Sequence, residues 1–92
     1  PSLGAYAVAK AGVIELTLTA AIEVAKFNIR INAVCPGWTE TAILDNAGRK
    51  GRESMQKNIP MGRLGHPSEV ANLISFLAGN ESSFITGTVH RI

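Results

Sequence analysis

The chain alternates between apolar stretches and short polar or glycine-containing breaks, and this pattern predicts its elements in order. Small and aliphatic residues dominate from about Gly4 to Lys26 without a proline, which predicts one long helix. The apolar positions of this segment do not share one stripe, and its few charged side chains cannot cover a whole polar face. We therefore expect this helix to be buried on more than one side, against its own domain and against a second surface.

Shorter segments follow the predicted helix. The β-branched run "FNIRINAVC", which is stopped by Pro36, predicts a strand of about six residues. Residues 38–58 are polar and interrupted by glycines, which indicates a mobile excursion with short helical patches rather than a core element. Residues 65–79 predict an amphipathic helix with Pro67 in its first turn, and residues 84–92 predict a final strand after a turn.

The order helix, strand, helix, strand predicts the fold class. A helical connection returns the chain to the same end of a sheet, so the two strands should be parallel. Parallel sheets are covered on both faces and need neighbouring strands. We therefore predict an α/β fold in which residues 1–92 form the C-terminal half of a doubly wound parallel-sheet domain, with the N-terminal half absent.

Composition and charge exclude several classes of function. Hydrophobic residues make up 46% of the chain and charged residues 17%, and no apolar run resembles a membrane span or a signal peptide, so we expect a soluble, cytoplasmic protein. The net charge is +2, and the basic cluster at residues 48–52 has no aromatic neighbours, which argues against nucleic-acid binding. Cys35 is the single cysteine, and His66 and His90 have no partner at ligand spacing, so we expect neither a disulfide framework nor a metal site.

A tyrosine and a lysine lie four positions apart in the apolar stretch "AYAVAKAG", residues 5–12. Four residues of helix turn about 400° and rise about 6 Å, so Tyr6 and Lys10 share one face and can act together. A tyrosine hydroxyl releases its proton poorly near neutral pH, and a nearby cation stabilises the phenolate. The pair is therefore a candidate proton-transfer site in which Lys10 tunes Tyr6. On spacing alone, a packed tyrosine beside a lysine whose stem covers apolar surface is the simpler explanation.

Three motifs in order make the catalytic interpretation the stronger one. The segments "PSLGAYAVAKAG", "IRINAVCPGWTET" and "PMGRLGHPSEVANLISFLAGNESSFITGTV" together resemble the C-terminal part of a short-chain dehydrogenase/reductase, over essentially the whole chain. Tyr6 and Lys10 match the family's Y-x-x-x-K pair. Residues 32–37 match its N-x-V-x-P-G segment, and Thr41 matches the threonine that follows.

The resemblance implies a partial NAD(P)-binding, Rossmann-type domain that spans residues 1–92 of an oxidoreductase acting on an alcohol or ketone. It implies that Tyr6 is the general acid/base on the substrate and that Lys10 also binds the nicotinamide ribose. Trp38 either lines the substrate pocket or simply packs at the strand end. The residues expected to line the nicotinamide of NAD or NADP are Pro36, Gly37, Thr39 and Thr41.

The rest of the family's site falls before Pro1. The glycine-rich phosphate loop, the residue that selects NAD or NADP and the catalytic Asn and Ser are all upstream, and Ser2 is too close to Tyr6 to be that serine. The resemblance also implies a homodimer or homotetramer, because the Y-x-x-x-K helix commonly packs against its copy across a two-fold axis. The competing interpretation is a non-catalytic binding or assembly module that retains the fold.

Overall fold

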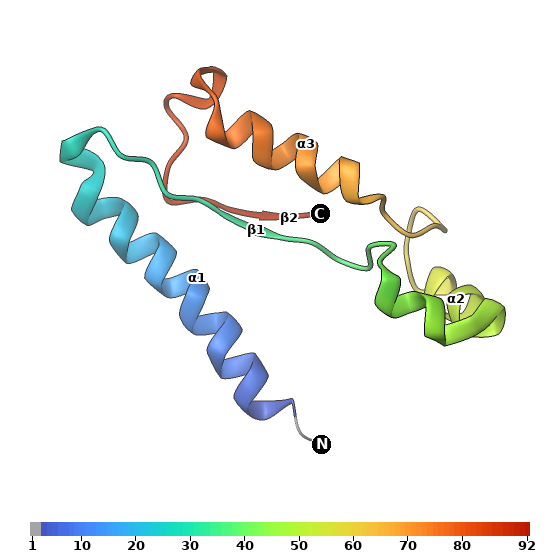
Figure 1. Cartoon of the computed structure of the whole chain (residues 1–92). Helices are drawn as coiled ribbons and strands as arrows, with labels where there is room; N and C mark the ends of the chain where they lie inside the picture. Colours follow the sequence, from blue (N-terminus) through green and yellow to red (C-terminus); the bar gives the residue numbers. More distant parts are fainter. Residues whose placement is uncertain (1–2) are drawn as a thin grey trace.

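The computed structural model describes residues 3–92, except for the side chain of Ile43. Helices and a small sheet follow one another along the chain (Figure 1). In order they are α1 (Gly4–Val24), a 3-10 turn η1 (Ala25–Phe27), β1 (Ala33–Cys35), a 3-10 helix η2 (Ala42–Ala47), α2 (Gly48–Lys57), α3 (Pro67–Ala78), a 3-10 turn η3 (Asn80–Ser82) and β2 (Val89–Arg91).

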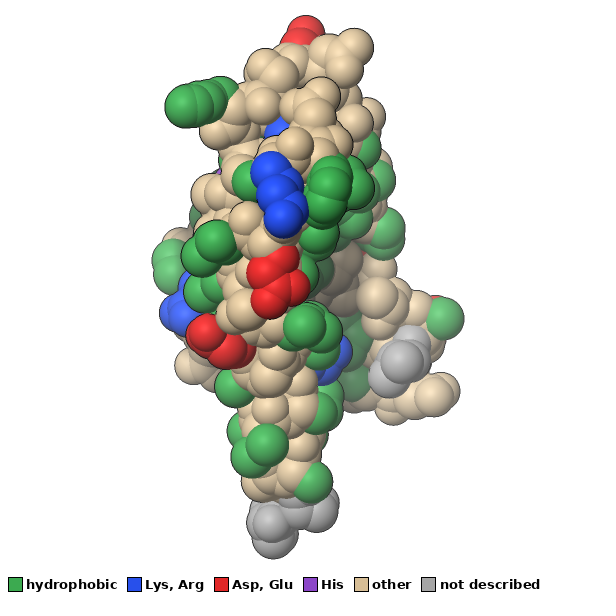
Figure 2. All heavy atoms as spheres, turned by 90° about the vertical axis from the view of Figure 1, so that its left-hand side faces the viewer, with side chains coloured by type: hydrophobic (Ala, Val, Ile, Leu, Met, Phe, Trp, Pro, Cys, Tyr) green, Lys and Arg blue, Asp and Glu red, His purple; other side chains and the backbone are tan. Residues whose placement is uncertain are grey.

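The first helix confirms the predicted segment and packs through small side chains. Thr17 and Ala21 are the buried residues of α1. A Cβ added at Gly87 would lie 3.5 Å from the Cβ of Ala21, so the helix and the turn before β2 approach closely at this point. The larger side chains Leu16 and Ile22 stay 67% and 80% exposed. Figure 2 shows apolar side chains along the outer face of this helix, which leaves a second apolar side uncovered by residues 3–92.

The two strands pair in parallel, which confirms the α/β class. The pairing extends beyond the strands themselves, because Ala33 N–H donates to the Thr88 carbonyl and Gly37 N–H to the Ile92 carbonyl. The first strand has only three residues, shorter than predicted. Residues 29–32 leave the regular ladder because the N–H of Ile31 bonds to a threonine side chain, the Oγ1 of Thr86, in place of a backbone carbonyl.

Two polar side chains fasten the start of β1 to the rest of the chain. The guanidinium of Arg30 donates to the Gly79 carbonyl at 3.0 Å and to the Ile85 carbonyl at 3.1 Å. The amide of Asn32 donates to the same Ile85 carbonyl at 3.0 Å and accepts from Thr88. These bonds satisfy carbonyls at the end of α3 and before β2 that are outside regular structure, and they fix where the parallel pairing begins.

The segment 38–58 is more regular than expected. The short helical patches expected there are the two consecutive helices η2 and α2. Leu44 within η2 is only 8% exposed, so this segment does contribute to the small core, together with Leu64 and Leu77. The expectation of a polar segment outside the core therefore applies to α2, which has no buried residue, but does not apply to η2.

The amphipathic helix predicted over 65–79 is confirmed as α3. It begins at Pro67, and its first turn is stabilised by Glu69, whose carboxylate accepts the backbone N–H of His66 at 2.8 Å. At the end of the helix, the hydroxyl of the buried Ser82 serves as a hydrogen-bond donor for the last carbonyls and lies 2.9 Å from the Leu77 carbonyl oxygen. No helix within residues 3–92 combines the length and the apolar character needed to cross a bilayer.

Candidate active site

The predicted site residues come from the start of α1 and from the end of β1. These elements run in opposite directions, so the start of the helix and the end of the strand lie toward the same edge of the sheet (Figure 1). In parallel α/β sheets the edge where strands end is the one that carries ligand sites. The chain order thus directs both halves of the predicted site to the appropriate edge.

Tyr6 and Lys10 lie next to each other, as their spacing predicts. The Lys10 ammonium nitrogen is 5.5 Å from the centroid of the Tyr6 ring, a distance at which the cation interacts with the ring face. The ring is 60% exposed, and residues 3–13 are all exposed. The pair is therefore formed by α1 itself, and its hydroxyl and ammonium groups are accessible to a bound molecule.

The segment after β1 is held by backbone hydrogen bonds on two sides. Gly37 N–H donates to the Ile92 carbonyl at 2.6 Å, on the side of β2. On the other side, Gly65 N–H donates to the Trp38 carbonyl at 3.0 Å, and Glu40 N–H donates to the Gly65 carbonyl at 2.8 Å. A Cβ at position 37 would lie 3.1 Å from the Ile92 carbonyl oxygen, so any other residue would require the two segments to move apart by a few tenths of an ångström. The segment is a fixed platform.

The remaining predicted residues lie along this platform. Pro36 is exposed directly after β1, and Thr39 donates its hydroxyl to the Gly37 carbonyl at 3.2 Å. Thr41 is exposed and precedes η2, and its carbonyl accepts the Leu44 N–H at 3.0 Å. All four predicted nicotinamide-lining residues are therefore together in one short stretch at the strand end.

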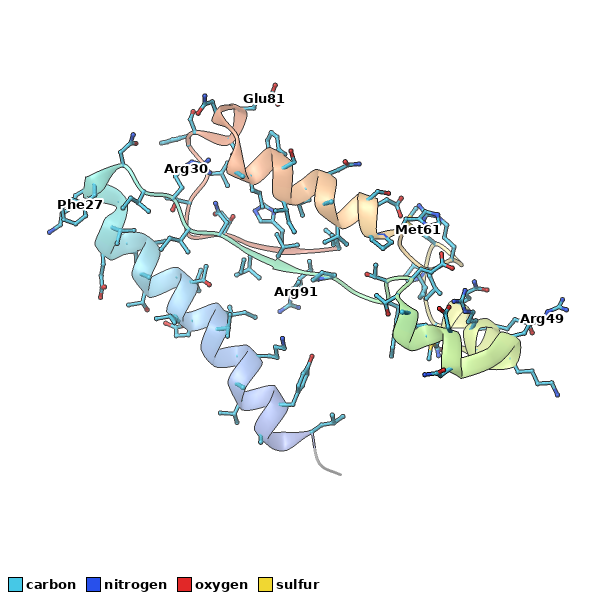
Figure 3. All side chains as sticks on the ribbon, in the orientation of Figure 1. Phe27, Arg30, Arg49, Met61, Glu81 and Arg91 are labelled. Carbon is cyan, nitrogen blue, oxygen red and sulfur yellow. The ribbon has the colours of Figure 1, made fainter. Side chains whose placement is uncertain are left out.

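A cavity of about 620 Å³ lies beside this platform. Trp38 is one of the residues that line it, and this residue is 56% exposed. Residues 58–61, which follow α2, and residues at the start of α3 also line the cavity. Figure 3 shows Met61 in the loop between α2 and α3. Sequence reasoning did not assign residues 58–61 to a site, and their only sequence signal is their position between the polar segment and the second helix.

The charged groups on the cavity wall neutralise each other. Arg63 donates to both carboxylate oxygens of Glu69, at 2.9 and 2.7 Å. This bond, together with the backbone N–H of His66, lowers the pKa of Glu69 from 4.5 to about 2. The Glu69 carboxylate is therefore ionised near neutral pH, and its oxygens are already hydrogen-bonded to Arg63 and to the backbone of His66. It stabilises the structure and is a poor proton donor.

No hydrogen bond joins Tyr6 or Lys10 to residues 36–41 in the part of the chain that the structure describes. Ser2, which is too near Tyr6 in the sequence to match the family's serine, lies outside the described residues.

A family model described as "Enoyl-(Acyl carrier protein) reductase" matches residues 1–92. The fold also matches the crystal structure of a short chain dehydrogenase family protein from Francisella tularensis, with a TM-score of 0.88 and 31% sequence identity, over 97% of this chain and 41% of that one. The chain belongs to the short-chain dehydrogenase/reductase family.

Curated members of the short-chain dehydrogenase/reductase family are similar over most of this chain. A 3-oxoacyl-(acyl-carrier-protein) reductase from Thermotoga maritima is 52% identical over 84 residues, which cover 91% of this chain and 34% of the relative. A human (3R)-3-hydroxyacyl-CoA dehydrogenase is 46% identical over 83 residues, covering 90% and 32%. The chain thus spans about a third of the length of these relatives.

Proposed function

We propose that residues 1–92 supply the C-terminal part of an NAD(P)-binding oxidoreductase domain that moves a hydride between the cofactor and an alcohol or ketone. The observation that carries this proposal is the Tyr6–Lys10 pair, which α1 presents at the edge of the sheet where β1 ends and the platform begins. The relatives' names, reductase and dehydrogenase, agree with this class of reaction.

The groups at this edge fit a nicotinamide nucleoside. The carboxamide and the ribose hydroxyls of that group are bound by neutral or cationic hydrogen-bond donors and by backbone groups rather than by carboxylates. Lys10 offers three N–H donors for ribose hydroxyls, and Thr39 and the backbone of residues 36–41 offer hydrogen-bonding groups for the amide. Bound here, NAD or NADP would supply the hydride.

In this proposal Tyr6 handles the proton that accompanies the hydride. Its exposed hydroxyl donates a proton to the carbonyl oxygen in reduction and accepts one from the alcohol in oxidation. Lys10, close to the ring, stabilises the phenolate electrostatically and holds the ribose, so that one cation orients the cofactor and assists proton transfer.

The cavity beside the platform is our candidate for the substrate. Its volume of about 620 Å³ is within the roughly 300–1,000 Å³ range of small-molecule sites. Trp38 and Met61 provide apolar surface on its walls, which favours a substrate whose carbonyl is attached to an apolar group. A 3-oxoacyl thioester, the class named for the Thermotoga maritima relative, is a suitable first substrate to assay.

We further propose that the protein is a homodimer or homotetramer. The outer side of α1 exposes Leu16 and Ile22, together with Val8 at 74% and Val13 at 58%. A second copy of the same helix would cover such an apolar face by symmetry. The competing assembly-module hypothesis predicts this interface but no cofactor-dependent turnover.

The test is Tyr6→Phe in the full-length protein that contains residues 1–92, assayed by oxidation of NADH and NADPH with a ketone panel. The substitution removes the transferable proton and little volume, so we expect turnover to fall by at least about 100-fold with cofactor affinity unchanged. Thr19→Val, which also removes an exposed hydroxyl from α1, is the matched control and should retain activity. Near-normal turnover in Tyr6→Phe would refute the proposal that Tyr6 is the general acid/base.

A further inference from the structure

Both ends of the segment that contains η2 and α2 enter the wall of the cavity. Thr39 lines the cavity immediately before this segment, and Asn58 lines it immediately after. Residues 40–57 therefore leave the cavity lining after Thr39 and return to it at Asn58. The position of α2 consequently determines how far residues 58–61 stand from the platform at residues 36–41.

Packing alone holds α2 weakly, because none of its residues is buried. Its contacts with the rest of the segment are with η2, which is also solvent-facing on its polar side. Near Gly65 the two cavity walls are joined by the backbone bonds to Trp38 and Glu40. No comparable backbone bond is found between α2 and the platform among residues 3–92.

A carboxylate connects α2 to the platform instead. Glu40 accepts a hydrogen bond from Arg52 of α2 at 2.8 Å, while its second oxygen is 3.5 Å from the Nδ1 of His66 at the start of α3. Arg52 also donates to Asp45 of η2 at 2.6 Å and is only 29% exposed. Glu40 is thus a platform residue whose backbone N–H is bonded to Gly65 and whose carboxylate links the platform to α2 and approaches the start of α3.

We propose that Glu40 is a positioning residue that holds α2 through Arg52 and thereby sets the width of the cavity for the substrate. Glu40 need not touch the substrate, because it acts through the placement of residues 58–61. The kinetic part of this inference rests on the proposed function, whereas the structural part, that Glu40 keeps α2 docked, is independent of it.

The chain offers a matched pair of variants. Glu40→Gln removes the carboxylate that links Arg52 to the platform. Glu53→Gln removes a carboxylate that pairs with Arg49, at 3.2 Å, within α2 itself. Figure 3 shows Arg49 pointing away from the rest of the molecule, and its side chain is 93% exposed. Both variants keep every lysine and arginine, and cleavage is scored after Lys50 and Lys57, because Glu53 itself follows Arg52 and alters trypsin cleavage at that bond.

Limited trypsin digestion of the full-length protein measures whether α2 stays docked. Cleavage within residues 49–57 follows the population of the opened segment when opening is fast. Loss of a partly shielded ion pair should raise that population, so we expect Glu40→Gln to be cut roughly three- to fivefold faster than the parent. Glu53→Gln should stay within about 1.5-fold. Equal cleavage of the two variants would overturn the proposal.

Steady-state kinetics test the consequence for the substrate. We expect Glu40→Gln to raise the KM for the ketone at least about threefold, while kcat and the KM for the cofactor stay within about twofold. High salt should raise the parent's KM toward the variant's value, because it screens the ion pair. Faster cleavage with an unchanged ketone KM would overturn the positioning role. Faster cleavage in a protein whose parent transfers no hydride would instead refute the proposed function and leave the docking role standing.

Discussion

The most quantitative consequence of the fold concerns Asn32, which stands at the start of the parallel pairing. Its amide nitrogen donates to the Ile85 carbonyl at 3.0 Å, and its oxygen accepts from Thr88, from the N–H at 3.2 Å and from the hydroxyl at 2.8 Å. Asn32→Ala removes all of these bonds at once. A simple sum would predict a large loss of stability.

The surrounding groups make the expected loss smaller. The Ile85 carbonyl keeps a donor, because Arg30 also bonds to it at 3.1 Å. The Thr88 hydroxyl keeps a partner in the Nε2 of His90 at 2.6 Å. Only the Thr88 N–H is left without a partner, and one unsatisfied, half-buried donor costs about 1–2 kcal/mol. We therefore expect the free energy of unfolding to fall by about that amount.

Urea unfolding of the full-length protein, followed by circular dichroism, measures this difference at equilibrium. Asn72→Ala, on the exposed face of α3, is the control and should change the free energy of unfolding by no more than about 0.5 kcal/mol. An equally small loss for Asn32→Ala would refute the reasoning. A loss above about 4 kcal/mol would contradict the claim that Arg30 and His90 retain their partners.

Three further predictions concern charge and assembly. Lys10→Met should weaken cofactor binding, because it removes the N–H donors proposed for the ribose, as measured by cofactor titration; an unchanged affinity would leave Lys10 a surface residue. Folding lowers the pKa of Glu69 from 4.5 to about 2, so the contribution of the ionised Glu69 to stability is complete above pH 4.5 and is lost as the pH falls toward 2. The difference in thermal midpoint between the parent and Glu69→Gln should therefore shrink from pH 4.5 to 2 and stay constant above pH 4.5. Sedimentation velocity should find a dimer or tetramer that Leu16→Arg dissociates, and a monomeric parent would contradict the proposed interface.

Helices were the predictable part of this fold. The uninterrupted small and aliphatic run of α1 and the single stripe with its Pro67 start in α3 are local patterns, and both helices form where the sequence predicts them. The length of β1 was not predictable, because its β-branched run does not reveal that the side chain of Thr86, far along the chain, takes the N–H of Ile31. Strand ends depend on such distant partners.

The candidate site divides in the same way. The proximity of Tyr6 and Lys10 follows from helical spacing alone, and the structure reproduces it. The contribution of residues 58–61 to the cavity was not predictable, because the fold of η2 and α2 decides whether these residues lie beside the same cavity as Trp38. The bond between Glu40 and Arg52 depends on the same fold, and no local spacing rule indicates a pair separated by a 3-10 helix.

The most direct test of the central proposal is to follow the hydride itself. The full-length protein would be given a ketone and NADH or NADPH in which both hydrogens at C4 of the nicotinamide are deuterium, and the alcohol product would be analysed by mass spectrometry. The proposal predicts one deuterium in each product molecule formed by the parent protein and a rate at least about 100-fold lower in Tyr6→Phe. A folded parent protein that binds the cofactor but transfers no deuterium, or equal transfer by Tyr6→Phe, would contradict it.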